Sequence, residues 1–374
     1  MPAKKLTAKE KEAVEQDKER TETDLADQKK RTQISRLFRQ TPAGQLLETS
    51  LSHQDVFHAY LFFGPADSLK DDAALLFGAS ILAGSDHLID ETEETGETAE
   101  LISQVYHGEH SDFICLDGTR REAIKKEEID EIQKRFSRTA SSAAGRKVYI
   151  ITRAENSSLN AMNSLLKFLE EPSGNVFAIL TTDNLERLLP TIRSRCITVQ
   201  FHSLPEETMK ELCRAEGLDE EDVYFLSTAA VRPDELGRTA AGRSYQTAKK
   251  MLKQYLNAEG SRELLYVDYE NRYRSKAGSD DGEGVRFKDA RDENLDTLDF
   301  FFRFLMQYYH AVCANDAEGP AWYHESAARL RQREDYMRVC TACMKAAADG
   351  RDKVNRNNDL SLLLAQTLVR LEDI

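Results

Sequence analysis

Residues 64–71, GPADSLKD, have part of the chemistry of a phosphate-binding loop. Such a loop needs glycines so that backbone N–H groups can surround phosphates, a lysine for the β- and γ-phosphates, and a Ser or Thr hydroxyl for Mg²⁺. Gly64 and Lys70 have the required spacing, but Leu69 replaces the second glycine and Asp71 replaces the hydroxyl residue. A carboxylate at Asp71 would repel a triphosphate. The sequence therefore predicts a degenerate loop that binds no ATP.

A second candidate lies at the end of the apolar run 148–151. In an ATPase, acidic residues at such a position hold Mg²⁺ and polarise water. Here Thr152 and Arg153 occupy the two positions, and Glu155 comes two or three residues further on, beyond the expected place of the metal. The loop at 64–71 and the segment after 148–151 both lack residues that a nucleotide site needs, so we expect no ATP hydrolysis by this chain alone.

A third candidate is the segment 188–196, LLPTIRSRC, which places Arg193 and Arg195 directly before a predicted strand. The two arginines could cap the carbonyl groups at the end of a helix and interact with its dipole. One of them could instead reach a phosphate on another subunit, because a planar guanidinium stabilises the charge of phosphoryl transfer. Composition alone leaves both interpretations open.

The elements that must position these residues are short apolar strands separated by helical patterns. The predicted strands are 59–63, 113–116, 148–151, 176–180 and 197–201. Continuous apolar strands that alternate with helices are typical of a parallel sheet covered by helices on both faces. The clearest helix starts near 156–158 and ends before Pro172. It is predicted to bury five residues, Leu159, Met162, Leu165, Leu166 and Leu169.

After Leu204 the strand pattern disappears. Helix starts at 205–207, 219–221 and 233–235 predict a small all-helical region. From about residue 244 to residue 374 the pattern is helical again, and the stretch 276–293, rich in Gly and Asp, is predicted to be an exposed loop or mobile insertion.

Composition limits the classes of protein that fit. The chain has 374 residues, with 51 Lys and Arg against 65 Asp and Glu, which gives a net charge of −14. This length predicts about two or three domains, and the charge disfavours a general nucleic-acid binder. The mean hydropathy of −0.57, the absence of a spanning apolar run or secretory signal, and six scattered cysteines favour a reduced cytoplasmic protein.

Residues 165–172, LLKFLEEP, followed by 189–196, LPTIRSRC, resemble the signature of bacterial clamp-loader subunits of the AAA+ superfamily. Residues 58–62 and 147–151 are also similar to that family, so the resemblance covers about 36–203. Within the family, intact nucleotide motifs mark the ATP-hydrolysing gamma/tau motors of DNA polymerase III. A degenerate Walker A loop beside an intact Ser-Arg-Cys motif resembles the delta-prime type.

The resemblance implies an α/β AAA+ core at 34–203, a helical lid domain at 204–242 and an all-α collar at 243–374 that joins subunits. Residues 1–33, which mix both signs of charge, are predicted to form a solvated, disordered tail or a loose helix. The resemblance also implies a hetero-oligomeric loader in which Arg195, between Ser194 and Cys196, acts as an arginine finger in trans. The helix at 157–171 would form part of the inter-subunit and DNA-facing surface.

The implied partners are gamma/tau motor subunits, a delta subunit, the sliding clamp and primer-template DNA, with ATP and Mg²⁺ held by the neighbouring motor. Two other hypotheses remain. The chain could be a divergent motor that still hydrolyses ATP, or a purely structural assembly platform.

This sequence departs from the family at the place where many relatives carry a four-cysteine zinc module. Residues 83–109 contain no cysteine, and the segment 86–100 is acidic. His87, His107 and His110 lack thiolates at zinc spacing, while Cys340 and Cys343 lack a second pair and lie in a helical pattern. We therefore expect no structural metal.

Overall fold

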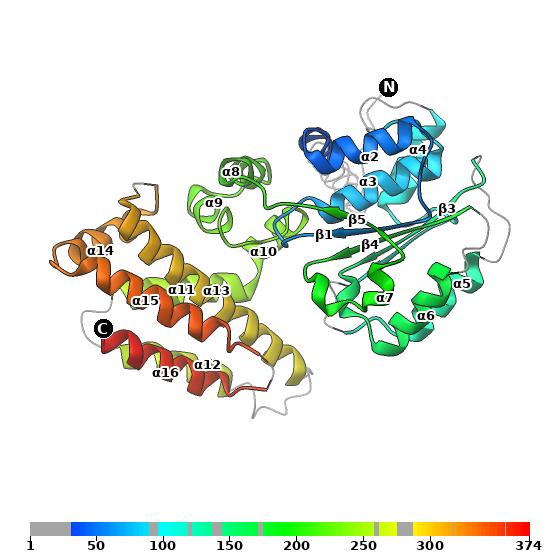
Figure 1. Ribbon diagram of the computed structural model, residues 1–374. Helices are drawn as coiled ribbons and strands as arrows, with labels where there is room; N and C mark the ends of the chain where they lie inside the picture. The colour runs from blue at the N-terminus through cyan, green and yellow to red at the C-terminus, as the bar shows by residue number, and fades with distance from the viewer. Residues whose placement is uncertain are drawn as a thin grey trace, which may run out of the picture. The chain divides into compact units, whose positions relative to one another are not determined.

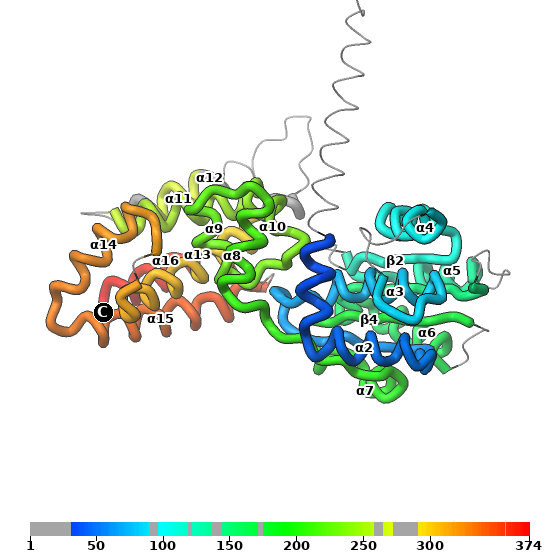
Figure 2. The backbone as a smooth tube through the Cα atoms, turned by 90° about the horizontal axis from the view of Figure 1, so that it is seen from above, coloured from blue at the N-terminus to red at the C-terminus, as the bar shows by residue number. Residues whose placement is uncertain are grey.

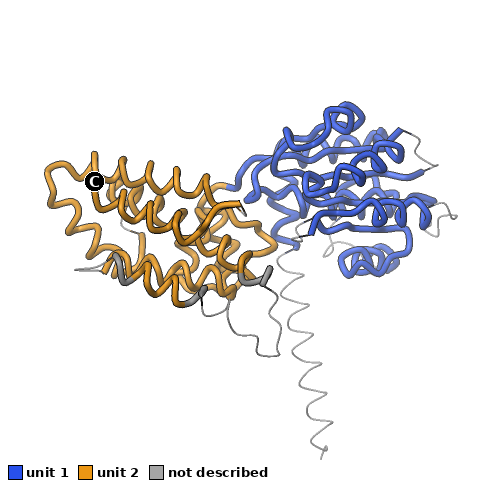
Figure 3. Tube along the Cα trace, turned by 90° about the horizontal axis from the view of Figure 1, so that it is seen from below, with its two compact units in different colours: residues 1–204 blue, residues 205–374 orange. Residues whose placement is uncertain are grey.

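The computed structural model describes residues 31–89, 96–118, 122–136, 144–170, 175–257, 262–274, 287–316, 318–355 and 357–374. The chain divides into two compact units, residues 1–204 and 205–374, which are drawn in different colours in Figure 3. Within the described ranges, no helix is long and apolar enough to cross a lipid bilayer.

Unit 1 is built on a parallel sheet. Its described strands are β1 (Ala59–Phe63), β2 (Phe113–Asp117), β3 (Lys147–Thr152), β4 (Val176–Thr182) and β5 (Ile197–Gln200). They pair in the order β2-β3-β4-β1-β5, and every pair is parallel. β1 therefore lies inside the sheet, between β4 and β5, and the carboxyl ends of all strands lie along one edge.

Helices cover both faces of this sheet (Figure 1). One face carries α2 (Pro42–Ser52), α3 (Lys70–Ala83) and α4 (Glu97–Tyr106), together with residues 31–39, which are also helical. Figure 2 views the unit from the side of these helices. The other face carries α5 (Lys126–Phe136), α6 (Leu159–Glu170) and α7 (Pro190–Arg193). Two short 3₁₀ turns, η1 (Ala154–Asn156) and η2 (Leu185–Arg187), follow β3 and β4.

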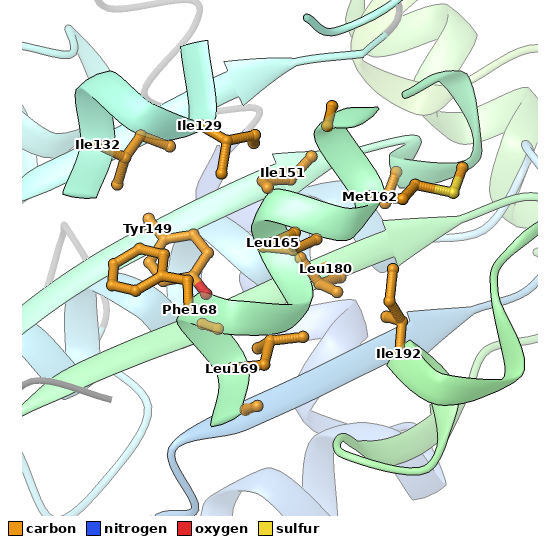
Figure 4. Close-up of a cluster of buried hydrophobic side chains, with 14 of the residues drawn as sticks. Ile129, Ile132, Tyr149, Ile151, Met162, Leu165, Phe168, Leu169, Leu180 and Ile192 are labelled. Atoms are coloured by element: carbon orange, nitrogen blue, oxygen red, sulfur yellow. The ribbon is translucent and has the colours of Figure 1, made fainter. Parts of the chain in front are cut away.

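The core beneath α5, α6 and α7 fixes the position of these helices on the sheet (Figure 4). Leu165 of α6 is 2% exposed, and Ile192 of α7 is fully buried in the same cluster. The ring of Tyr149 on β3 stacks on that of Phe168 on α6, with centroids 4.8 Å apart. Because apolar burial holds both α6 and α7, the ends of these two helices have a defined relative position.

All five predicted strands are confirmed, with differences of one or two residues at their ends. The clearest predicted helix is α6, and Met162, Leu165 and Leu169 are buried as expected. The prediction for Leu159 is wrong, because its side chain is 64% exposed. Leu159 is the first residue of α6, so helical spacing alone did not define its surroundings.

Unit 2 is helical throughout its described residues. Its elements are α8 (Glu206–Ala215), α9 (Glu220–Leu226), η3 (Pro233–Glu235), α10 (Leu236–Ala241), α11 (Arg243–Asn257), α12 (Arg262–Arg274), α13 (Phe287–Ala314), α14 (Ala321–Arg331), α15 (Tyr336–Arg351) and α16 (Leu360–Glu372). The predicted helix starts near 206, 220 and 233 are confirmed. α13 packs against α11 and α15, with Phe301, Phe304 and Leu305 fully buried.

The boundary between the two units falls one residue from the predicted end of the AAA+ core at residue 203. The further division between a lid at 204–242 and a collar at 243–374 lies inside unit 2 and stays a prediction. The predicted tail, residues 1–33, lies almost wholly outside the described residues, as does the predicted loop up to residue 286. Residues 287–293, which were expected in that loop, begin α13 instead.

Candidate functional site

The loop that follows β1 closes tightly on neighbouring strands. The Gly64 N–H donates to Thr182 O at 3.2 Å, at the end of β4. A Cβ atom on Gly64 would lie only 2.4 Å from the backbone oxygen of Phe201, just after β5. Glycine is required here because another backbone segment approaches closely. This packing is a sufficient reason for Gly64, whether or not the loop binds a ligand.

Lys70, the first residue of α3, is fully buried and its ammonium group has partners inside the chain. Its Nζ donates to Pro65 O at 2.8 Å and lies 2.6 Å from Oδ1 of Asp183. A P-loop lysine contacts β- and γ-phosphates. In this chain a carboxylate of the protein itself takes that place.

The strand order explains why Asp183 reaches Lys70. β4 lies between β3 and β1, so the residue after β4 lies between the segments that follow the other two strands. The second oxygen of Asp183, Oδ2, lies 3.4 Å from Nε of Arg153, which follows β3. The Asp183 carboxylate is therefore shared by two cations, and we call Lys70, Arg153 and Asp183 the edge triad.

Arg153 occupies one of the two positions expected to be acidic, and its backbone is left-handed, with φ 45° and ψ 54°. This conformation costs a non-glycine residue roughly 1–2 kcal/mol. Contacts with β4 hold it in place: the Arg153 N–H donates to Thr181 Oγ1 at 3.1 Å, in addition to the ion pair with Asp183.

The remaining candidate residues of this edge also have partners within the chain. Asp71, at the position of the Mg²⁺-binding hydroxyl, accepts a hydrogen bond from Thr181 Oγ1. Leu69 is 2% exposed and packs in the core. Thr152 Oγ1 accepts from the Gly118 N–H at 3.1 Å, and Glu155, 6% exposed, accepts from the Asp183 N–H at 3.0 Å.

Arg195 lies at the opposite edge of the sheet from the edge triad. It precedes β5, whereas Lys70 follows β1, and Ile197 pairs with Tyr60 in the parallel register. From Tyr60 to Gly64 the chain runs about 13 Å along the strand. The guanidinium of Arg195, which contacts Thr191 O and Glu170, therefore lies at the amino-terminal edge, far from the loop that carries Lys70.

Two acceptors hold the Arg195 side chain, which is 34% exposed. Nη1 donates to Thr191 O at 2.9 Å, and Nη2 lies 2.6 Å from Oε1 of Glu170, the last residue of α6. The contact with Thr191 is the carbonyl capping considered from the sequence. Because the side chain stays partly exposed, capping does not prevent a contact with another molecule.

The neighbours of Arg195 fix its turn. Ser194 caps α7, and its Oγ donates to Thr191 O at 3.1 Å. Cys196 packs against the core cluster beneath α6, and burial raises the pKa of its thiol to about 12. The Cys196 side chain is therefore a neutral packing group at pH 7 and not a nucleophile.

Sequence reasoning missed Asp183 and Glu170, the two carboxylates that pair with the candidate cations. Asp183 had a usable signal, because it directly follows a predicted strand and strand ends share one edge in a parallel sheet. Glu170 lies within the signature 165–172, but nothing in that signature indicated its pairing with Arg195, because the contact between the end of α6 and the turn before β5 depends on how the helices pack. For metal ligands, the described residues contain no cluster of three or more His, Cys, Asp or Glu side chains suited to hold an ion.

The fold and the edge triad together define the class. A glycine turn and a lysine after a central strand of a parallel sheet are the frame of P-loop proteins, and in this chain a helical unit follows that α/β core.

Comparison with known families narrows the class. A family model described as DNA polymerase III, delta subunit, matches residues 39–205. The delta-prime subunit of Bacillus subtilis DNA polymerase III is 38% identical over 169 residues, which are 45% of this chain and 49% of that protein. Unit 1 is therefore similar in sequence to delta-prime-type clamp-loader subunits of DNA polymerase III.

Other relatives are also subunits of DNA polymerase III. The delta-prime subunit of Pseudomonas aeruginosa is 35% identical over 142 residues, 37% of this chain and 42% of that protein. The tau subunit of Bacillus subtilis is 31% identical over 190 residues, 49% of this chain and 32% of that protein. The chain thus spans about half or less of the length of these curated relatives.

Among solved structures, a DNA polymerase III gamma subunit-related protein from Thermotoga maritima covers 87% of this chain and 98% of its own, with a TM-score of 0.39 and 17% identity. The fold class rests on the sheet order and not on this likeness.

Proposed function

We propose that this chain is a non-hydrolysing, delta-prime-type subunit of the DNA polymerase III clamp loader. In this role it helps to place the sliding clamp on primed DNA, together with gamma/tau-type motors and a delta subunit. It binds no ATP or Mg²⁺ itself and supplies Arg195 in trans to the ATP site of a neighbouring motor. The delta-prime relatives, which match at higher identity than the tau relative, support this assignment.

The observation that carries the proposal is the ion pair between Lys70 and Asp183. A triphosphate could reach Lys70 only by displacing a carboxylate 2.6 Å away and by approaching Asp71, a second carboxylate. Breaking a buried ion pair by removing one partner costs about 3–5 kcal/mol. ATP would have to recover a penalty of this order before gaining affinity, and its Mg²⁺ would find Asp71 and Thr152 already hydrogen-bonded within the chain.

The position of Arg195 supports a role in trans. Its side chain lies at the edge of the sheet opposite to the edge triad, far from the nucleotide position of its own chain. An arginine delivered to a γ-phosphate by another subunit is worth about 10³–10⁵ in rate in well-studied phosphoryl-transfer systems. The partly exposed guanidinium is suited to such a contact.

The rival function is an ATP-hydrolysing motor of the gamma/tau type, which the 31% identity to a tau subunit favours. ATP binding separates the two. We expect calorimetric titration of the isolated chain with millimolar MgATP to give no heat above dilution and purified protein to retain no nucleotide. Saturable binding near one equivalent would contradict the proposal and support the motor.

Replacing Arg195 tests the trans role in a loader reconstituted from this chain and its partners. We expect Arg195→Ala to lower the steady-state ATPase rate by at least about tenfold, because one motor site loses its transition-state charge partner. Arg193→Ala is the matched control, since Arg193 lies two residues away and pairs only with Glu186 among the described residues. Equal ATPase rates for both variants would contradict the role of Arg195 as an arginine finger. The remaining hypothesis would then be that the chain is a purely structural assembly platform.

A further inference from the structure

Glu170 and Arg195 join two segments that lie 25 positions apart in the sequence. Glu170 ends α6, and Arg195 lies in the turn between α7 and β5. Their ion pair, at 2.6 Å, connects the Nη2 atom of the guanidinium to Oε1 of the carboxylate. Together with the hydrogen bond from Nη1 to Thr191 O, this pair fixes both terminal nitrogens of Arg195.

The stability of α6 does not explain a glutamate at this position. The carboxyl end of a helix carries partial negative charge, so an acidic residue there is unfavourable for the helix itself. Glu170 is also 48% exposed, so its removal would leave no cavity in the core. What Glu170 does in this structure is to hold the guanidinium of Arg195.

We propose that Glu170 is a positioning residue that orients Arg195 before a neighbouring subunit docks. This inference rests on the proposed function of Arg195. A guanidinium has five N–H donors. The two contacts seen among the described residues use one on each terminal nitrogen and leave three for a phosphate. Glu170 thus lowers the number of orientations that Arg195 samples and still leaves donors for its ligand.

The alternative is that Glu170 retains Arg195 and competes with the phosphate. The exposure of the pair argues against this, because ion pairs that are a third to a half exposed are weak and are screened by salt. A weak contact can favour one orientation of a long side chain, but it cannot keep an arginine from a polyphosphate that carries several charges.

The decisive variants are Glu170→Ala and Glu170→Gln in the reconstituted loader. We expect Glu170→Ala to lower kcat for ATP by about two- to fivefold, the range of an exposed pair, with KM unchanged. Glu170→Gln keeps an acceptor oxygen and should retain most of the rate. A kcat of Glu170→Ala equal to or above that of the wild type would overturn the inference, as would a loss of kcat that follows weaker assembly of the complex.

Glu186→Ala is the matched control. Glu186 forms an exposed ion pair with Arg193, with Nη1 and Oε1 3.2 Å apart, close to the same turn. We expect this variant to keep the wild-type kcat. If Glu186→Ala lowers kcat as much as Glu170→Ala, the effect belongs to surface charge in general, and the positioning role fails.

A second measurement on the isolated chain separates a failure of this inference from a failure of the proposed function. Arginine side-chain ¹⁵N relaxation should show an ordered Arg195 Nε–H in the wild type and in Glu170→Gln, and a mobile one in Glu170→Ala. Unchanged order in Glu170→Ala would overturn the positioning role. If the order changes as expected but Arg195→Ala leaves the ATPase rate unchanged, Glu170 still positions Arg195, and it is the trans role that fails.

Discussion

Asp183 is the residue that connects the two cations of the edge triad. Its carboxylate lies between the cations of Lys70 and Arg153, so the charge that a phosphate would neutralise is already neutralised. Lys70 has no exposed side-chain surface, and Asp183 is 21% exposed. A buried ammonium without an anionic partner is costly, so the edge triad stabilises the loop after β1 in the absence of nucleotide.

Asp183→Asn should therefore destabilise the protein. The amide keeps an oxygen for hydrogen bonding but loses the charge, and we expect the free energy of unfolding to fall by about 1–3 kcal/mol in urea denaturation. Inorganic pyrophosphate should restore part of this loss in the variant and leave the wild type unchanged, because only the variant lacks an anion beside Lys70.

The control for this variant is Glu186→Gln, which removes the charge from an exposed pair and should change the free energy of unfolding by less than about 0.5 kcal/mol. A stability of Asp183→Asn equal to that of this control would show that the edge triad contributes nothing to the fold.

At the scale of single residues, the sequence identified the cations but not their partners. Lys70, Arg153 and Arg195 were recognisable because their positions relative to strands have a chemical meaning. Glu170 lies in the signature 165–172, but its role as the partner of Arg195 was not recognisable, since that contact joins two elements that are distant along the chain. Ion pairs of this kind are set by packing, which a single sequence does not display.

At the scale of elements, buried parallel strands were the most predictable part of the fold. β1, β3 and β4 are almost wholly buried, so they appear in the sequence as continuous apolar runs. β5 was found although three of its four residues are exposed, because the run 197–201 includes the buried Val199 and Phe201. Within α6 the burial prediction failed at its first residue, Leu159, which is exposed.

The order of the strands could not be predicted, and it has the largest consequence for the site. Only the position of β4 between β3 and β1 brings Asp183 between two cations. Likewise, only the pairing of β5 with β1 places Arg195 at the far edge of the sheet from Lys70. Both facts follow from pairings between segments far apart in the chain, which local patterns do not specify.

At the scale of the whole molecule, the edge triad and Arg195 lie at opposite edges of the sheet of unit 1, while unit 2 has its own helical core. Leu165 belongs to the cluster beneath α6, and Leu305 is buried on α13 in unit 2. A unit with its own core can unfold as a cooperative body, since each core supplies the burial that stabilises its own elements.

We therefore expect scanning calorimetry of the full chain to show two transitions. Leu165→Ala and Leu305→Ala remove the same atoms from the two cores and should each cost about 2–5 kcal/mol, lowering one transition by roughly 5–15 °C and leaving the other in place. A single transition that both substitutions lower equally would mean that the two units unfold as one body. In that case a substitution that destabilises the helical unit would also destabilise unit 1, which carries Arg195. The effects of substitutions on the ATPase rate of a loader would then have to be separated from their effects on stability.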